Sequence, residues 1–75
     1  MSTLNDLKVG ARARVEAIDG ADEVSLRLLE MGVTPAVEVR LLGTAPLGDP
    51  LEFELRGYRL SIRKSEAARI SVVLL

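Results

Sequence analysis

A proline-rich corner divides the chain and constrains its fold more than any other feature. The segment 45–51 reads Ala-Pro-Leu-Gly-Asp-Pro-Leu and lies between two short runs that alternate apolar and polar residues. Pro46 and Pro50 fix their own φ at about −65° and bias the preceding residue away from helix. Gly48 and Asp49 are residues that favour turns. The corner therefore predicts a rigid loop between two strands.

The runs on either side of the corner have the period of half-buried strands. The run 37–41 places three apolar residues on one face, and 51–55 alternates apolar residues with glutamate. A two-residue turn at Arg56 and Gly57 would join the second run to 58–62 as a hairpin. The predicted register sets apolar residues opposite each other and opposite charges together: Leu55 with Tyr58, Glu54 with Arg59, Phe53 with Leu60, and Leu51 with Ile62.

The first part of the chain predicts another strand. The run 11–18 alternates, with Ala13, Val15 and Ala17 on the inner face. Ile18 is out of phase with them, which indicates a bulge or a sharp bend near the strand end.

A short amphipathic helix should follow over residues 23–31. Asp22 is a suitable N-cap, and apolar residues recur at i, i+4 and i+7 from Val24. Gly32 favours the left-handed conformation that ends helices, and Pro35 prevents continuation.

The C-terminal part predicts one helical turn and a last strand. We expect the turn over 65–68, capped by its serine, and the strand over 70–75, facing inward through Ile70, Val72 and Leu74. Five short strands in so small a chain hide their edges best by closing on themselves. The expected fold is all-β: a small five-stranded SH3-like barrel with one short α-helix inserted between strands 1 and 2.

Composition limits the classes of function. The 75 residues make one small domain, and with one Phe, one Tyr and no Trp the core must be aliphatic. No cysteine is present, which makes the cytoplasm the default location, and no apolar run approaches the ~20 residues of a membrane span. The formal net charge of −1, without aromatic residues among the basic ones, argues against binding nucleic acid.

Three segments together resemble the family of ferrous iron transport protein A (FeoA). They are 28–35 (LLEMGVTP), 45–50 (APLGDP) and 60–64 (LSIRK), and the resemblance covers nearly the whole chain, 1–75. It implies an SH3-like domain of the bacterial cytoplasm that supports ferrous iron uptake by binding the cytoplasmic part of FeoB, a membrane transporter with a GTP-binding domain. Similar domains also occur at the C-terminus of repressors of the diphtheria toxin repressor type. The alternative function is therefore a self-associating or docking module of a metal-responsive regulator.

Ala36 departs from the pattern of this family, which usually has glycine after the proline. If the turn requires a positive φ, alanine costs about 1 kcal/mol there. Either the turn type differs or the strain is tolerated.

The sequence offers only weak candidates for metal ligands and catalytic groups. Asp49, Glu52 and Glu54 could attract a cation, but no histidine or cysteine accompanies them, and we expect solvated carboxylates with Glu54 paired to Arg59. No glycine-rich run leads into a helix with the Lys and Ser/Thr of a phosphate-binding loop. We therefore expect no catalytic residue, no bound metal and no cofactor.

The function is then expected to depend on a surface that binds a partner protein. Leucines that flank the inner stripe of the helix, or lie in loops, complete the core if they are buried, and form an interface if they are exposed together. The predicted contact surface is the helix with the nearby proline-rich loop: Leu26, Arg27, Leu29, Glu30, Leu47, Gly48 and Asp49. The competing hypothesis is that the same leucines form a weak homo-oligomer.

Overall fold

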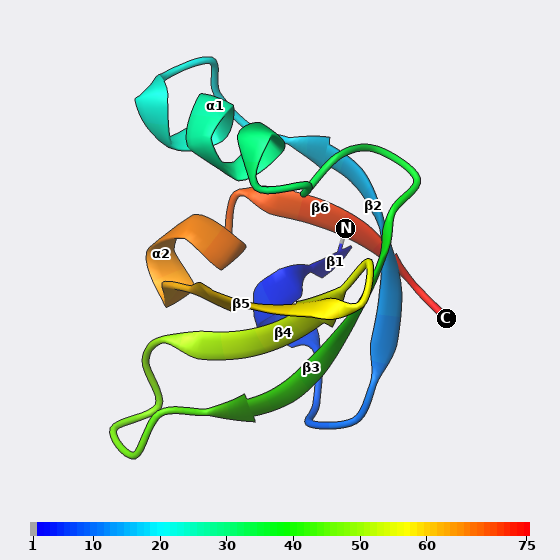
Figure 1. Cartoon of the computed structure of the whole chain (residues 1–75), viewed down its shortest axis with the longest axis vertical. Coiled ribbons are helices and arrows are strands. Elements are labelled where there is room, and N and C mark those ends of the chain that lie inside the picture. The colour runs from blue at the N-terminus through cyan, green and yellow to red at the C-terminus, as the bar shows by residue number, and fades with distance from the viewer. Residues whose placement is uncertain (1) are drawn as a thin grey trace.

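The alternating runs of the sequence form strands of one antiparallel sheet in the computed structural model, which describes residues 2–75 (Figure 1). The sheet has the order β1-β6-β2-β3-β4-β5. Its strands are β1 (Ser2–Thr3), β2 (Arg12–Ile18), β3 (Glu38–Thr44), β4 (Leu51–Leu55), β5 (Tyr58–Ile62) and β6 (Ile70–Leu74). The helical elements are the 3-10 helix η1 (Leu4–Asp6) and the α-helices α1 (Glu23–Glu30) and α2 (Lys64–Ala67).

The expected barrel of five strands is corrected to an open, curved sheet of six strands. The additional strand is β1, which pairs with β6 through Ser2 and Val72. Two residues are too few for a periodic pattern, so the sequence could not reveal this strand. The edge strands β1 and β5 do not pair with each other. In this part of the fold η1 contacts α2, with Asn5 Nδ2 donating to the carbonyl of Lys64 at 2.9 Å.

The core is aliphatic, with one aromatic ring at its centre. Phe53 is fully buried, and β4 alternates buried and exposed residues along its whole length, as predicted. Val15 of β2, Leu28 of α1 and Ile62 of β5 are buried with it in one cluster. The sheet and the helix α1 therefore share a single core.

The hairpin of β4 and β5 has the predicted register. Leu55 lies opposite Tyr58, and Phe53 lies opposite Leu60. The predicted ion pair of Glu54 with Arg59 is not formed: the two residues are neighbours across the strands, but Arg59 Nη1 lies 3.8 Å from Glu52 Oε1 instead. The long arginine side chain reaches its diagonal neighbour on the same face of the sheet.

The predicted bulge is present in β2 and changes which side chains face inward. The register against β6 shifts between Val15 and Ala17. Ala17 is exposed as a result, and Ile18 is half-buried against the core, so the expectation that Ala17 faces inward was wrong. Leu74 was also expected inside but is 51% exposed, at the C-terminal end of β6 (Figure 1).

The helix α1 has the predicted N-cap residue, whereas α2 has a different one. Asp22 is the N-cap of α1, and its Oδ1 accepts a hydrogen bond from the backbone N–H of Ser25 at 3.2 Å. The expected cap of α2, Ser65, lies inside that helix, whose N-cap is Arg63. The N–H of Lys64 is satisfied from elsewhere in the chain, by Asp49 Oδ1 at 3.0 Å.

The turn before β3 is strained at Ala36, which answers the question that the sequence left open. Ala36 has a φ of 76°, in the left-handed region that favours glycine. Its N–H donates to the carbonyl of Val15 at 2.8 Å, and the N–H of Val15 donates to the carbonyl of Val37 at 2.9 Å. Hydrogen bonds to β2 thus hold the strained residue in place.

Candidate interaction surface

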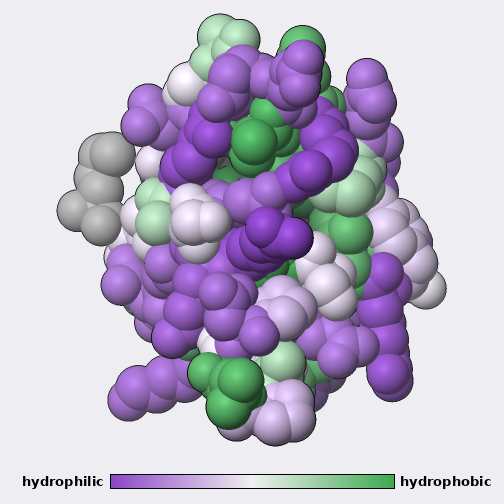
Figure 2. Space-filling model, turned by 90° about the vertical axis from the view of Figure 1, so that its left-hand side faces the viewer, coloured by the Kyte–Doolittle hydropathy of each residue, from purple (hydrophilic) through white to green (hydrophobic). Residues whose placement is uncertain are grey.

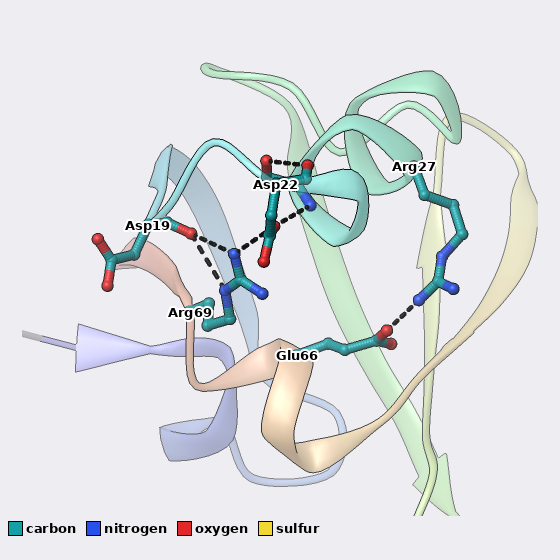
Figure 3. A network of polar contacts seen from close by, with 6 residues as sticks. Asp19, Asp22, Arg27, Glu66 and Arg69 are labelled. Carbon is teal, nitrogen blue, oxygen red and sulfur yellow. Dashed lines mark hydrogen bonds and ion pairs between the residues drawn. The ribbon is translucent and has the colours of Figure 1, made fainter.

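The start of α1 is fastened to the sheet by one arginine (Figure 3). Arg69 precedes β6, and its Nε and Nη2 donate to the carbonyl oxygen of Asp19 at 3.1 and 3.0 Å. Its Nη2 also lies 2.7 Å from Asp22 Oδ1. The N-cap of α1 is therefore held by a residue 47 positions later in the sequence.

The ion pair affects the titration of the carboxyl group. The hydrogen bond from Arg69, with the backbone N–H of Ser25 second, lowers the pKa of Asp22 from 3.8 to about 2. The same interaction with Asp22 raises the pKa of the Arg69 guanidinium. Asp22 therefore stays charged throughout the neutral and mildly acidic range.

Further contacts hold the middle and the end of α1. Arg27 forms an ion pair with Glu66 of α2, seen in Figure 3. At the C-terminal end the hydroxyl of Tyr58 donates to the carbonyl oxygen of Met31. Side-chain contacts from two other elements thus restrain α1, which is only eight residues long.

The two leucines that flank the inner stripe of α1 are exposed. Leu26 is 56% exposed and Leu29 is 40% exposed. They border an apolar groove of about 350 Å³ between α1 and the end of β2. The groove is lined by Glu16, Ala17, Ile18, Gly20, Ala21, Ser25, Leu26, Leu29 and Pro35.

The proline-rich loop exposes one leucine on a hydrogen-bonded turn. Leu47 is 96% exposed. The N–H of Ala45 donates to the carbonyl of Pro50 at 3.0 Å, and the N–H of Gly48 donates to that of Ala45 at 2.7 Å. Asp49, through its bond to the N–H of Lys64, attaches the loop to α2. The prediction of a corner between two strands is confirmed.

The structure separates the two parts of the predicted contact surface. Figure 1 shows α1 at one end of the long axis and the loop between β3 and β4 at the other end. The expectation that the loop lies near the helix was therefore wrong. The intervening element is α2, which contacts α1 through Arg27 and Glu66 and the loop through Asp49. On this side of the molecule hydrophobic atoms form separate areas within a mostly hydrophilic surface (Figure 2).

A second hollow, of about 410 Å³, lies on the outer face of the sheet and is polar. Arg12, Arg40 and Arg56 line it together with Glu38 and Glu54. Arg12 Nη1 lies 3.5 Å from Glu38 Oε2. Positive and negative groups are interleaved there, as expected for a solvated surface.

The candidate metal ligands do not converge. Asp49 accepts the backbone N–H of Lys64, and Glu52 pairs with Arg59 on the sheet. Across residues 2–75, no three His, Cys, Asp or Glu side chains gather where they could hold a metal ion. Of the helices within the same residues, none is both long and apolar enough to cross a membrane.

Comparison with known proteins shows to which family this chain belongs. The model of the FeoA domain matches residues 2–74. The chain belongs to the FeoA family. This family is linked to ferrous iron transport, and the resemblance seen in the sequence is confirmed.

Several relatives resemble this FeoA chain over nearly all of its length. It is 32% identical over 72 residues to the Fe(2+) transport protein A/Fe(2+) transporter FeoB fusion protein of Porphyromonas gingivalis, covering 96% of this chain and 8% of the fusion protein. The solution structure of FeoA from Chlorobium tepidum superposes with a TM-score of 0.91 at 36% identity, over 99% of this chain and 70% of that one. FeoA of Stenotrophomonas maltophilia was solved in complex with zinc and is described as a prokaryotic SH3 domain protein. It superposes with a TM-score of 0.86 at 32% identity, over 97% of this chain and 91% of that one.

The SH3-like fold extends beyond the FeoA proteins. The IdeR protein of T. acidophilum superposes with a TM-score of 0.86 at 19% identity, over 99% of this chain and 34% of that one. At this identity the likeness concerns the fold alone. The predicted relationship to the repressor domains is thus confirmed as a structural similarity.

Sequence reasoning missed the part of the groove that β2 contributes. Glu16, Ala17 and Ile18 line it because the bulge turns Ala17 outward, and Pro35 approaches from the turn before β3. The phase change at Ile18 was the available signal. Arg69 and Glu66 were missed as well, because pairing of residues so distant in the chain leaves no local pattern.

Proposed function

We propose that this FeoA chain is a non-catalytic accessory and regulatory protein of bacterial ferrous iron uptake, which binds the cytoplasmic part of the FeoB transporter. The observation that carries the proposal is the Porphyromonas gingivalis relative, named for both transport protein A and FeoB in one polypeptide. Joining two binding modules covalently raises their effective concentration, which favours a partnership that already exists. The proposal places the chain in the cytoplasm, without nucleic acid among its partners.

The surface of α1 supports this proposal. Exposed apolar residues beside a groove are typical of protein interaction sites, and α1 carries Leu26 and Leu29 at such a groove. Arg69, Glu66 and Tyr58 hold the helix in position. A partner would therefore meet a preorganised surface, which lowers the entropic cost of binding.

The experiment measures binding to FeoB from the same bacterium, purified in lipid nanodiscs, by interferometry. We expect L26D/L29D to lose binding by about tenfold or more, because aspartate removes the apolar contact. The matched control is L74D/L75D, the same change at two leucines that are 51% and 56% exposed at the C-terminal end of the chain. Equal binding by L26D/L29D, folded according to its circular dichroism, would contradict the proposed surface.

Self-association is the other outcome that this experiment must separate. Light scattering over a concentration series reports it directly. A chain that remains monomeric while binding FeoB supports the accessory role, whereas a dimer disrupted by L26D/L29D would assign the same leucines to a homo-oligomer.

A further inference from the structure

The negative charge of this chain is concentrated around the α1 groove. Residues 16–30 contain five acidic residues and one basic residue, although the whole chain has 11 acidic and 10 basic residues. The remaining residues therefore carry nine basic groups against six acidic ones. The acidic residues of this segment are Glu16, Asp19, Asp22, Glu23 and Glu30, and the basic one is Arg27.

One of these carboxylates lines the groove, and two more flank a leucine that lines it. Glu16 lines it directly. Glu23 and Glu30 are exposed on α1, three residues before and four residues after Leu26, so they flank that leucine on the helix surface. The groove thus has an apolar lining and an acidic rim.

The two arginines closest to α1 form their ion pairs with other carboxylates. Arg27 is paired with Glu66, and Arg69 is engaged by Asp22 and the carbonyl of Asp19. Within residues 2–75 the carboxylates of Glu16, Glu23 and Glu30 are in no ion pair. Their charge remains available to a partner.

We propose that the groove binds a short segment of FeoB in which one or two large apolar side chains are flanked by lysine or arginine. This rests on the proposed function and adds to it the chemistry of the bound segment. The apolar side chains enter between Leu26, Ile18 and Pro35, and the basic groups meet the acidic rim. Complementary charge of this kind selects the partner and accelerates the encounter.

A second copy of the chain does not suit this groove. A symmetric dimer brings the same patch of both subunits together, so the carboxylates of one acidic rim would approach those of the other. Like charges across an interface are unfavourable. The charge of the groove therefore favours a different, basic partner.

The test compares two triple variants for binding to FeoB in nanodiscs at low and high salt, about 50 and 500 mM. E16Q/E23Q/E30Q removes the rim, and E38Q/E52Q/E54Q makes the same change in charge on the outer face of the sheet. We expect the first to bind about tenfold more weakly at low salt and to lose most of its salt dependence, and the second to bind within about twofold of the native chain. Ala17→Phe, which fills the groove from an exposed position, should weaken binding at both salt concentrations.

Each alternative result has a definite meaning. If both triple variants bind FeoB as the native chain does, or are weakened equally, the acidic rim does not select the partner and this inference fails while the proposed function stands. If the native chain does not bind FeoB at all, both fail. If sedimentation shows a dimer that Ala17→Phe dissociates, the groove is occupied by a second copy and the inference is overturned.

Discussion

The guanidinium of Arg69 lies 2.7 Å from the carboxylate of Asp22 and joins the start of β6 to the N-cap of α1. The same guanidinium also donates to the carbonyl of Asp19. One side chain thereby fixes the start of the helix that borders the apolar groove. The surface proposed to bind FeoB depends on this contact for its geometry.

The first prediction concerns the dependence of stability on pH. The folded state holds the pKa of Asp22 at about 2, below its ordinary value of 3.8, so its ionised form stabilises the fold above about pH 4. This contribution is lost as the pH falls through 2. We expect the melting temperature of the native chain to exceed that of Asp22→Asn by a constant amount above about pH 5, and the difference to vanish toward pH 2. A difference independent of pH would show that the charge of Asp22 contributes nothing.

The second prediction concerns the end of α1. Gly32 has a φ of 100°, and a Cβ there would collide with the hydroxyl of Tyr58. The left-handed conformation alone costs an alanine about 1–2 kcal/mol. Gly32→Ala should lower the free energy of unfolding by more than this cost. At Gly10 φ is also positive, but a Cβ would meet no other atom. Urea unfolding of Gly10→Ala therefore measures the cost of the left-handed conformation without a collision. Gly43→Ala has neither problem.

The order of these three glycine variants is the test. Gly32→Ala should be the least stable and Gly43→Ala the most stable of the three. Equal losses for Gly32→Ala and Gly10→Ala would show that Tyr58 moves aside at no cost.

The third prediction is a gain in stability. Ala36 has a φ of 76°, so Ala36→Gly relieves strain and should raise the free energy of unfolding by about 1 kcal/mol. In a domain of this size that is about 4–8 °C in melting temperature. Ala68→Gly is the control, because Ala68 has a φ of −64° and glycine there should give a loss. A loss at Ala36 as well would mean that the left-handed turn is not the native conformation.

The fourth prediction concerns the two separated parts of the contact surface predicted from the sequence. Leu47 is 96% exposed, so Leu47→Asp should change stability by less than about 0.5 kcal/mol. Because the loop and α1 lie at opposite ends of the molecule, the effects of Leu47→Asp and Leu26→Asp on FeoB binding should be independent. Interferometry should therefore give a double variant whose loss of affinity is the product of the two single losses. A strongly non-multiplicative result would mean that both leucines meet one element of the partner.

The hairpin of β4 and β5 shows how much of the fold could be predicted. Phe53 pairs with Leu60 as expected, because a two-residue turn and strict alternation leave one register that buries the apolar face. The cap of α1 at Asp22 was predictable for a similar reason, since the capping contact lies within four residues. The FeoA family was recognisable because its short segments keep their order and spacing along the chain.

The candidate site was predicted less completely. Leu26 and Leu29 were named as contact residues from their position beside the inner stripe of the helix, but whether they are buried or exposed was left open until the structure. The opposite wall of the groove was not foreseen, because the bulge in β2 moves Ala17 outward. The pairing of β1 with β6 is also beyond prediction from periodicity, because two residues make no pattern.

By itself the sequence determined the alternating strands, the helix with its N-cap and the corner at 45–50 between two strands, because backbone preferences and side-chain periodicity act over a few residues. Only the tertiary structure decided that Arg69 binds Asp22, that Glu16 lines a groove with Leu26, and that the corner lies far from α1. These relationships depend on the curvature and strand order of the sheet. Such features bring distant residues together without leaving a periodic trace in the chain.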